Sequence, residues 1–437
     1  MFALDLRGGR MRPRSLLPVL ALGAAALTGC SPQPGTTINL YLSPEDHLQT
    51  VVDRCTEQAH GRYRIVYHKL PRGADGQREQ MVRRLAAADD SMDVLGLDVT
   101  WVPEFAEAGW IQPWTGADES AATRDVLPGP LATARWHGKL YGATKNTNVQ
   151  LLWYDDRVVP QPPGSFDEMI ERAGELEAAG KPYRIVFTGA QYEGLVVFYN
   201  TLVASAGGHI LSDDGKSVVL DAGAVRALSL LKTLTSAGVT DPSLTNQKED
   251  DIRQAFQRGQ AGFELNWPFV YAAYAQEKPR ELAHLRWARY PSVIPGRPGR
   301  TTIGGYNLAV SSYSPHRREA FEAALCLRSP ASQKYQALVD GLPPSLAAVY
   351  RDPAPLDPSR PADPAGNPTI AQQYPMRDDI QAALRDAAVR PLTPAYQNLS
   401  TVISKVLSPP SEIDPEATAA ELRERLTDAL NSRGIIP

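Results

Sequence analysis

The chain has 437 residues, of which 43% are hydrophobic and 22% charged, and its formal net charge is −4 at pH 7. This is the composition of an ordinary globular protein. A mildly acidic chain without a basic stripe argues against nucleic acid or an anionic lipid surface as the main partner. The sequence has no C-x-x-C or H-E-x-x-H motif and its seven histidines are scattered, so we expect neither a metal site nor a cofactor.

The first thirty residues predict export. Four arginines lie within the first 14 residues, before an uncharged stretch from 15 to 29 that is rich in Leu, Ala and Val. This stretch is too short for a permanent membrane helix, which needs about 20 apolar residues. The segment Leu27-Thr28-Gly29-Cys30 resembles the lipobox of bacterial lipoproteins. We therefore expect residues 1–29 to be a signal peptide, and Cys30 to be acylated and to anchor the protein to the outer face of the cell membrane through a tether, 30–36. The alternative is a plain secretory signal with an incidental cysteine.

Removal of the leader leaves 408 residues with a net charge of −7. This length suits two domains of about 150 to 200 residues each. Two cysteines remain besides Cys30, at Cys55 and Cys326. An oxidising exterior permits a disulfide between them, which would close a long loop. The alternative is two unrelated buried thiols.

The first third of the chain alternates between strand-like and helix-like patterns. The expected strands are residues 37–42, 63–68 and 92–98, and the expected helices are 48–57 and 77–88. This order predicts an α/β domain with a parallel sheet covered on both faces. Ligands of open α/β sheets bind beyond the carboxyl ends of the strands, and Asp98 falls at such an end.

The middle of the chain predicts a second α/β unit. Its expected strands are 149–154, 184–187 and 301–310, and its expected helices are 166–179, 195–206, 222–237 and 250–260. A Pro-rich stretch, 343–375, breaks the regular pattern. Helical patterns return at 378–388 and 415–431.

Several polar residues near the expected ends of elements have the chemistry that a sugar needs. A sugar presents many hydroxyl groups, which donate and accept hydrogen bonds, and an apolar C–H face. Carboxylates accept from two hydroxyls at once, Asn amides donate and accept, Arg donates in a fixed fork, and Trp offers a flat surface. The set that predicts a carbohydrate cleft is Asp98, Asn148, Glu264, Trp267 and Arg390.

Each of these residues also has an ordinary structural explanation. Asp98 is also suited to cap a helix, and Asn148 to form a turn. Glu264 is equally suited to solvent or a local salt bridge, and Trp267 to core packing. Arg390 is suited to cap the carbonyls of the preceding helix. Taken alone, the residues predict an exported two-domain α/β protein with a polar cleft.

Longer motifs raise the specificity of the prediction. The segments DVLGLDVTW (93–101) and FAEAGW (105–110) resemble a region of the solute-binding proteins of bacterial ABC importers. Six further segments resemble the mycobacterial trehalose-binding lipoproteins of this family, in the same order along the chain. They are LPGPLATA (127–134), TNVQLLWY (147–154), EGLVV (193–197), NWPFV (266–270), TIGG (302–305) and DAAVRP (386–391).

This resemblance implies a two-domain periplasmic-binding-protein fold of type II, like maltose-binding proteins, with the ligand cleft between the domains. Such a protein is a monomer and not an enzyme. It closes on a disaccharide by hinge motion and delivers it to permease subunits that a separate ATPase drives. The implied domains are 36–145 plus 305–341, and 146–304 plus 342–437.

The family's sugar-contacting positions carry over to ten residues of this chain. They are Asp98, Asn148, Glu264, Trp267, Gly305 and Arg390, with Glu45, Asp46, Gln77 and Glu193 as second-tier contacts. Two departures leave the preferred disaccharide open. The segment between Tyr274 and Thr301 is shorter than in the mycobacterial proteins, and the loop at 43–46 differs in sequence and length.

Three other functions remain as alternatives. Asp98 and Glu264 are candidates for the acid and base of a glycosidase, although the sequence has no nucleophile elbow, phosphate loop or metal motif. The ligand of a binding protein is alternatively maltose, another oligosaccharide or a glycerol phosphodiester. A phosphorylated ligand would prefer more Arg and Lys than this set contains, which favours neutral sugars. The third alternative is a structural or adhesive lipoprotein.

Overall fold

The structure is a computed structural model that describes residues 35–433. The predicted signal peptide, the acylation of Cys30 and almost all of the tether lie outside the described residues. Among the helices of the described range, none has the length and the apolar content that a membrane crossing requires.

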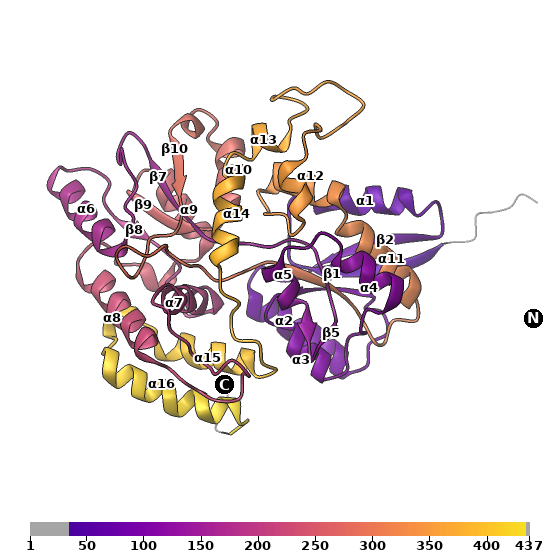
Figure 1. The fold of residues 1–437 in the computed structure, drawn as a ribbon, viewed down its shortest axis with the longest axis horizontal. Helices are drawn as coiled ribbons and strands as arrows, with labels where there is room; N and C mark the ends of the chain where they lie inside the picture. Colours follow the sequence, from indigo (N-terminus) through magenta and orange to yellow (C-terminus); the bar gives the residue numbers. More distant parts are fainter. Residues whose placement is uncertain (1–34, 434–437) are drawn as a thin grey trace, which may run out of the picture. The chain divides into compact units, whose positions relative to one another are not determined.

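The first sheet has five strands in the order β2-β1-β3-β11-β6. We call the part of the chain built around it the first lobe (Figure 1). Its strands are β1 (Thr36–Leu42), β2 (Tyr63–Lys69), β3 (Val94–Asp98), β6 (Ala143–Thr144) and β11 (Tyr306–Val310). Helices α1 (Leu48–Gln58) and α2 (Ala74–Ala86) connect the first three strands, as the sequence predicted.

The prediction of a parallel sheet is correct for β1, β2 and β3 and wrong for the rest of the sheet. β11 runs antiparallel to β3 and to β6. The reason is where the chain enters the sheet. β11 starts at Tyr306, opposite Asp98, so it begins at the carboxyl end of β3 and must run back along it.

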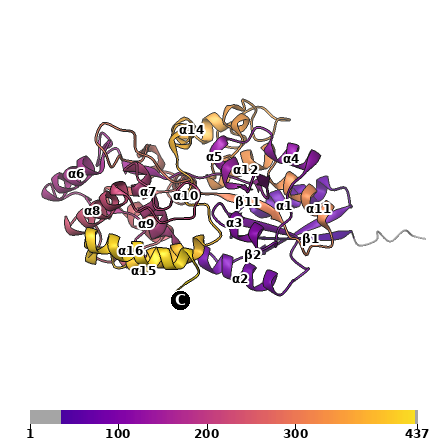
Figure 2. The ribbon, with the colours of Figure 1, turned by 60° about the horizontal axis from the view of Figure 1, so that its bottom comes forward.

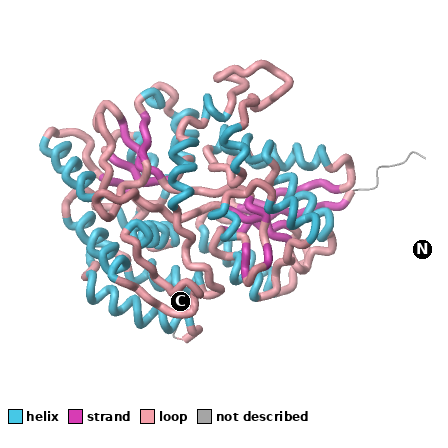
Figure 3. Tube along the Cα trace, viewed as in Figure 1, coloured by secondary structure: helices cyan, strands magenta, loops and turns pink. Residues whose placement is uncertain are grey.

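The second sheet has four strands in the order β10-β7-β9-β8, and the surrounding part of the chain is the second lobe. Its strands are β7 (Leu151–Asp155), β8 (Ile185–Val186), β9 (Phe263–Asn266) and β10 (Leu285–Ala288). β7 is antiparallel to β9 and β10, whereas β8 is parallel to β9. The strands of the two sheets form two separate groups in the tube drawing (Figure 3).

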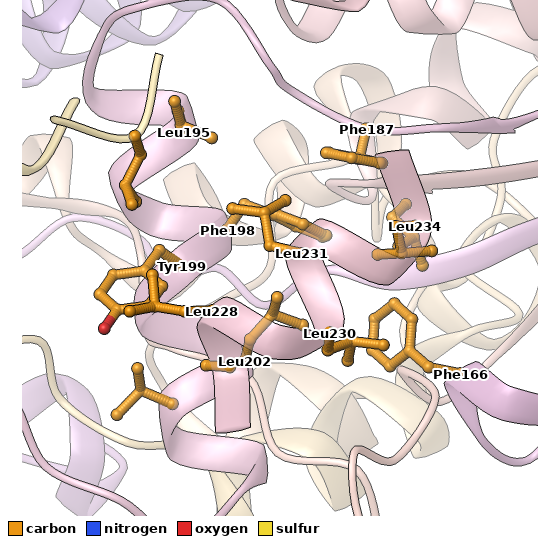
Figure 4. Close-up of a cluster of buried hydrophobic side chains, with 14 of the residues drawn as sticks. Phe166, Phe187, Leu195, Phe198, Tyr199, Leu202, Leu228, Leu230, Leu231 and Leu234 are labelled. Atoms are coloured by element: carbon orange, nitrogen blue, oxygen red, sulfur yellow. The ribbon is translucent and has the colours of Figure 1, made fainter. Parts of the chain in front are cut away.

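Helix α7 (Glu193–Ser205) is the central helix of the second lobe. All of its residues are buried, because its sequence is apolar on nearly every side. Leu195, Phe198 and Leu202 pack with side chains of α8 (Ala222–Ser236) and α6 (Phe166–Ala178) (Figure 4). The C-terminal helices α15 (Tyr396–Val406) and α16 (Pro415–Leu430) pack on each other and on α7 and α8 (Figures 1 and 2).

Other helices complete the two lobes. The sequence predicts two of them, α9 (Glu249–Gln257) and α14 (Arg377–Asp386). Four others were not predicted, namely α10 (Phe269–Glu277), α11 (Arg317–Leu327), α12 (Pro330–Asp340) and α15. The short elements are α3 (Val102–Glu107), α4 (Gly116–Thr123), α5 (Pro128–Thr133), α13 (Ile370–Gln373), β4 (Arg135–Trp136) and β5 (Lys139–Leu140).

A disulfide joins Cys55 of α1 to Cys326 of α11, which confirms the predicted pairing over the alternative of two free thiols. Both helices pack against the first sheet and contact each other. The bond therefore ties a late segment of the chain into the lobe that the N-terminal strands begin. The domain boundaries given above stay a prediction.

Candidate ligand-binding cleft

A cavity of about 430 Å³ lies where residues of the two lobes meet. This volume falls within the range of small-molecule sites, roughly 300 to 1,000 Å³. Seven of the ten predicted ligand contacts line it, namely Gln77, Asp98, Asn148, Glu193, Trp267, Gly305 and Arg390. These residues are distant in sequence, and the fold brings them to one place.

Asp98 is the last residue of β3 and belongs to the first lobe. Its Oδ1 accepts hydrogen bonds from the backbone N of Thr100 at 3.0 Å and from the Thr100 hydroxyl at 2.8 Å. The same oxygen accepts a hydrogen bond at 2.9 Å from Nη2 of Arg390, in the second lobe. Asp98 is therefore both a turn residue and one half of an ion pair between the lobes.

Arg390 follows α14, and only 2% of its side chain is exposed. Its guanidinium pairs with Asp98 and with Glu193. Burial opposes the charged form, but the carboxylates of Asp98 and Glu193 and the nearby Tyr396 outweigh burial and raise the pKa of Arg390. The side-chain hydrogen bonds of Arg390 go to these groups and not to carbonyls of α14, unlike the helix-capping alternative.

Glu193 is the first residue of α7, and its carboxylate is held by protein groups. Oε1 accepts hydrogen bonds from the Tyr396 hydroxyl at 2.6 Å and from Arg390, and Oε2 accepts one from the Ser400 hydroxyl. Burial raises the pKa of Glu193. The charge of Arg390 and the hydrogen bonds from Ser400 and Tyr396 act in the opposite direction but do not cancel this increase. Although Glu193 lines the cavity, its hydrogen bonds within the protein point to a role in orienting Arg390.

Asn148 and Trp267 stand at the place where two chain segments cross. The backbone of Asn148 bridges Gly304, whose N–H donates to the Asn148 carbonyl at 2.9 Å. The side-chain Oδ1 of Asn148 is buried and has no hydrogen-bond partner among the described residues. The Trp267 ring lies against Gly304, so closely that a Cβ on Gly304 would be 3.0 Å from the ring. The cleft thus offers a hydrogen-bonding amide beside an aromatic side chain.

Gly305 has a backbone φ of +119°, which side chains rarely permit. A Cβ there would be 2.6 Å from the Asn146 carbonyl oxygen. The next residue, Tyr306, also lines the cavity and donates a hydrogen bond to Gln77 Oε1 at 3.2 Å. Gln77 is buried and in turn donates to the Arg72 carbonyl at 3.0 Å. Gly305 therefore allows the close crossing that brings Tyr306 to the cleft.

Glu264 is not among the residues that line this cavity. It lies in β9 opposite Trp153, is fully buried, and accepts a hydrogen bond from Asn266 Nδ2 at 2.7 Å. Its Oε2 has no partner among the described residues. Burial raises the pKa of Glu264 to about 8. In this structure the side chain contributes to the interior of the second sheet, and a ligand contact stays a prediction.

Glu45 and Asp46 line a neighbouring cavity of about 260 Å³. The two cavities share wall residues from both lobes, among them Arg72 and Asp250. Glu45 is bound by the fully buried Lys145, whose Nζ donates to its two oxygens at 2.9 and 2.8 Å. Glu45 therefore compensates a buried charge, whereas Asp46 is an exposed residue in the wall of the neighbouring cavity.

Sequence reasoning missed several residues that line the cleft. Tyr306 is absent from the predicted set, as is the run from Lys248 to Asp251 at the start of α9. The run of acidic residues indicates a helix N-terminus, and nothing in the sequence shows that this helix faces the first lobe.

Together the two cavities are lined by nine carboxylate side chains and four cationic ones. This negative balance disfavours an anionic ligand. Within residues 35–433, no cluster of His, Cys, Asp or Glu has the composition of a metal site.

The sequence profile of bacterial extracellular solute-binding proteins matches residues 49–334. The chain belongs to this family. A probable ABC transporter-binding protein of Deinococcus radiodurans is 27% identical over 296 residues, which cover 65% of this chain and 69% of that protein. A putative binding protein of Brucella abortus is 25% identical over 199 residues, 44% of this chain and about half (48%) of the relative.

Solved structures of this family have the same fold. Maltose-bound T. maritima MalE3 has a TM-score of 0.79 at 24% identity, and the alignment covers 90% of this chain and 99% of the MalE3 chain. The GacH receptor of Streptomyces glaucescens, solved unliganded and with acarbose, has a TM-score of 0.74 at 20% identity, with coverage of 92% and 100%. These similarities confirm the predicted type II fold with two domains and a cleft between them.

The family and these structures are solute-binding proteins and not enzymes. The glycosidase alternative is therefore wrong. The structure also argues against it, because Asp98 is tied to Arg390 and Glu264 is buried in β9.

Proposed function

We propose that this family member is the lipid-anchored binding protein of an ABC sugar importer. It binds a neutral disaccharide, with trehalose favoured, and delivers it to membrane permease subunits. The observation that carries the proposal is the composition of the cleft. It combines an unsatisfied amide oxygen on Asn148, the Trp267 ring, and the Asp98–Arg390 pair. Directional polar groups beside an aromatic face are what a sugar requires.

The ligands named for similar structures support a sugar as the ligand of this protein. Besides the maltose and acarbose complexes, a cyclo/maltodextrin-binding protein solved with maltotetraose has a TM-score of 0.70. The excess of carboxylates around the cleft disfavours a phosphorylated ligand such as a glycerol phosphodiester. Trehalose itself is supported by the motifs shared with the mycobacterial trehalose-binding lipoproteins.

Ligand capture would use a hinge where the chain crosses between the lobes. One crossing connects β6 to β7, and another leads through Gly304 and Gly305 into β11. The Asn148–Gly304 bridge joins these two crossings side by side. Short adjacent segments of this kind absorb the backbone changes of domain closure.

The test is isothermal titration of residues 31–437 with trehalose, maltose, sucrose and glucose. We expect saturable binding of trehalose, weaker binding of the other disaccharides and the weakest binding of glucose. Trp267→Ala and Asn148→Ala should each weaken trehalose binding by tenfold or more, about 1.4 kcal/mol. Trp136→Ala, a tryptophan outside the cavity lining, is the matched control. If none of the four sugars produces a heat of binding, the proposal is refuted.

A longer oligosaccharide is the second candidate ligand. It is favoured by the neighbouring cavity of about 260 Å³, which continues from the cleft past Arg72 and Asp250 and includes Phe269 in its wall. Maltotriose and maltotetraose added to the same titrations decide between the candidates. A ligand of this length should bind more tightly than maltose, and Phe269→Ala should remove that difference.

The lipid anchor is tested separately, in cells. Metabolic labelling with a fatty-acid probe should mark the wild-type protein and not Cys30→Ala. The unmodified variant should be lost from the membrane fraction. Equal labelling of the two proteins would contradict acylation at Cys30.

A further inference from the structure

A chain of buried hydrogen bonds runs from α15 through the cleft to the first lobe. Tyr396 and Ser400 of α15 donate to the two carboxylate oxygens of Glu193. Glu193 accepts from Arg390, and Arg390 donates to Asp98 of β3 at 2.9 Å. Neither Tyr396 nor Ser400 lines the cavity. The chain thus connects residues behind the cleft to the residue that faces it from the other lobe.

All the members on the second-lobe side are buried. The exposed fractions are 2% for Ser400, 4% for Tyr396, 9% for Glu193 and 3% for Arg390. Hydrogen bonds between buried charged groups are stronger than the same bonds in water, and they depend on geometry. Moreover, the guanidinium carbon of Arg390 lies 5.8 Å from the centre of the Tyr396 ring. Arg390 is therefore restrained on one side by α15 and α7 before it reaches Asp98.

A free arginine side chain has many rotamers, and fixing it on binding costs conformational entropy. A guanidinium already held in one orientation avoids that cost when the lobes close, which is the benefit of preorganisation. Glu193 holds the guanidinium only if its own carboxylate is fixed. Tyr396 and Ser400 fix it, since they occupy one oxygen each.

We infer that Tyr396 and Ser400 are positioning residues of the cleft, which orient Arg390 through Glu193 and so secure the Asp98–Arg390 pair that joins the lobes. This inference rests on the proposed function as a binding protein that closes on its ligand. The pair acts as a latch within the protein. It favours the closed arrangement, and a bound ligand leaves slowly while the latch holds.

The variants Tyr396→Phe and Ser400→Ala remove one hydroxyl each and leave the packing of α15 nearly unchanged. Each should increase the dissociation rate of trehalose by about tenfold, the scale of a hydrogen bond to a charged group. The association rate should not fall, because the ligand enters the open state, which the variants favour. The matched control is Thr401→Ala, whose hydroxyl donates within α15 to the Gln397 carbonyl at 2.9 Å. Stopped-flow measurements give both rates.

A ligand-free measurement separates this inference from the proposed function. Fluorophores on cysteines introduced at Gln80 of α2 and Gln254 of α9, which are exposed, report the distance between the lobes by energy transfer. Ser400→Ala and Tyr396→Phe should shift the protein towards the open state, and Thr401→Ala should not. In an Asp98→Asn background, where the latch is already weakened, Ser400→Ala should have a smaller effect.

The outcomes differ for the two ideas. If the wild type binds trehalose and both variants behave like Thr401→Ala in rate and in energy transfer, the positioning role is wrong and the proposed function stands. If no sugar binds and the energy transfer still responds to both variants, the proposed function is wrong and the latch stands. Full additivity of Ser400→Ala with Asp98→Asn would also overturn the positioning role.

Discussion

Glu264 is a carboxyl group held away from water inside the second sheet. Its one hydrogen bond comes from Asn266, and one of its oxygens has no partner among the described residues. The protonated form is favoured there because burial penalises the charge. The environment of Glu193 differs, because Glu193 is also buried but its carboxylate is bound by Arg390 and two hydroxyls.

Glu264→Gln should alter how stability depends on pH. The pKa of Glu264 is about 8 in the folded protein, compared with 4.5 for an ordinary glutamate. Below pH 4.5 the residue is protonated in both states. Between the two values only the unfolded state ionises, so wild-type stability falls as the pH rises, by a few kcal/mol at most. The variant should lack this decline and exceed the wild type at pH 8.

Denaturant unfolding between pH 4.5 and 9 measures the difference. Glu57→Gln, which changes an exposed glutamate on α1, is the control and should follow the wild type. Parallel stability profiles for Glu264→Gln and the wild type would show that Glu264 is ionised in the folded protein.

At the scale of elements, two links hold segments that are far apart in the sequence. The disulfide joins α1 to α11, 271 residues further along the chain. β11 is the other link, because it enters the first sheet between β3 and β6 after the chain has passed through the second lobe. Both links make the first lobe depend on residues that follow the second sheet.

Removal of the disulfide should destabilise the first lobe. The double variant Cys55→Ala/Cys326→Ala should lose roughly 2 to 5 kcal/mol of unfolding free energy, because the bond closes a long loop. Denaturant unfolding with and without a reducing agent tests this. The wild type under reducing conditions should match the variant, and a variant as stable as the oxidised wild type would contradict the prediction.

Gly305→Ala should disturb the chain crossing at the start of β11. The positive φ and the approach of 2.6 Å to the Asn146 carbonyl leave no room for a methyl group. The expected loss is about 1 to 3 kcal/mol of stability, together with weaker ligand binding, since Tyr306 and Asn148 are displaced. Gly174→Ala on α6, where a methyl group meets nothing within 4 Å, is the control for thermal unfolding and titration.

At the scale of the whole described chain, the polar contacts between the lobes differ in how far they are buried. In the Asp98–Arg390 pair, Asp98 is partly buried and Arg390 is buried, with exposed side-chain fractions of 18% and 2%. Gln397 of α15 also reaches the first lobe, where it donates to Asp75 of α2 at 2.9 Å, but this contact is exposed. Exposed polar contacts contribute little, whereas loss of one partner of a buried pair is strongly destabilising.

Gln397→Ala should therefore change trehalose affinity by less than about fivefold, or 1 kcal/mol. Arg390→Gln should weaken it by more than tenfold, since Asp98 and Glu193 would lose their common partner. Titration of the two variants side by side measures this contrast. Similar losses for both would show that the buried pair has no special part in ligand binding.

The sequence by itself determined half of the α-helices and the longest strands of the described residues, because apolar periodicity survives wherever a face is buried. It also pointed to Asp98, Asn148, Trp267 and Arg390, whose chemistry and motifs are visible without a structure. It did not locate α15, which lies between a proline-containing turn and α16 and has polar residues at several of its positions. That helix supplies Tyr396 and Ser400.

Only the tertiary structure decided which polar groups are satisfied by the protein and which remain for a ligand. Glu45, Glu193 and Glu264 are the same residue type in the sequence. They differ because the fold surrounds one with Lys145, the second with Arg390 and two hydroxyls, and the third with little besides Asn266. Such partners come from distant segments. Hydrogen bonding and burial are therefore properties of the folded chain, whereas periodicity and residue chemistry are properties of the sequence.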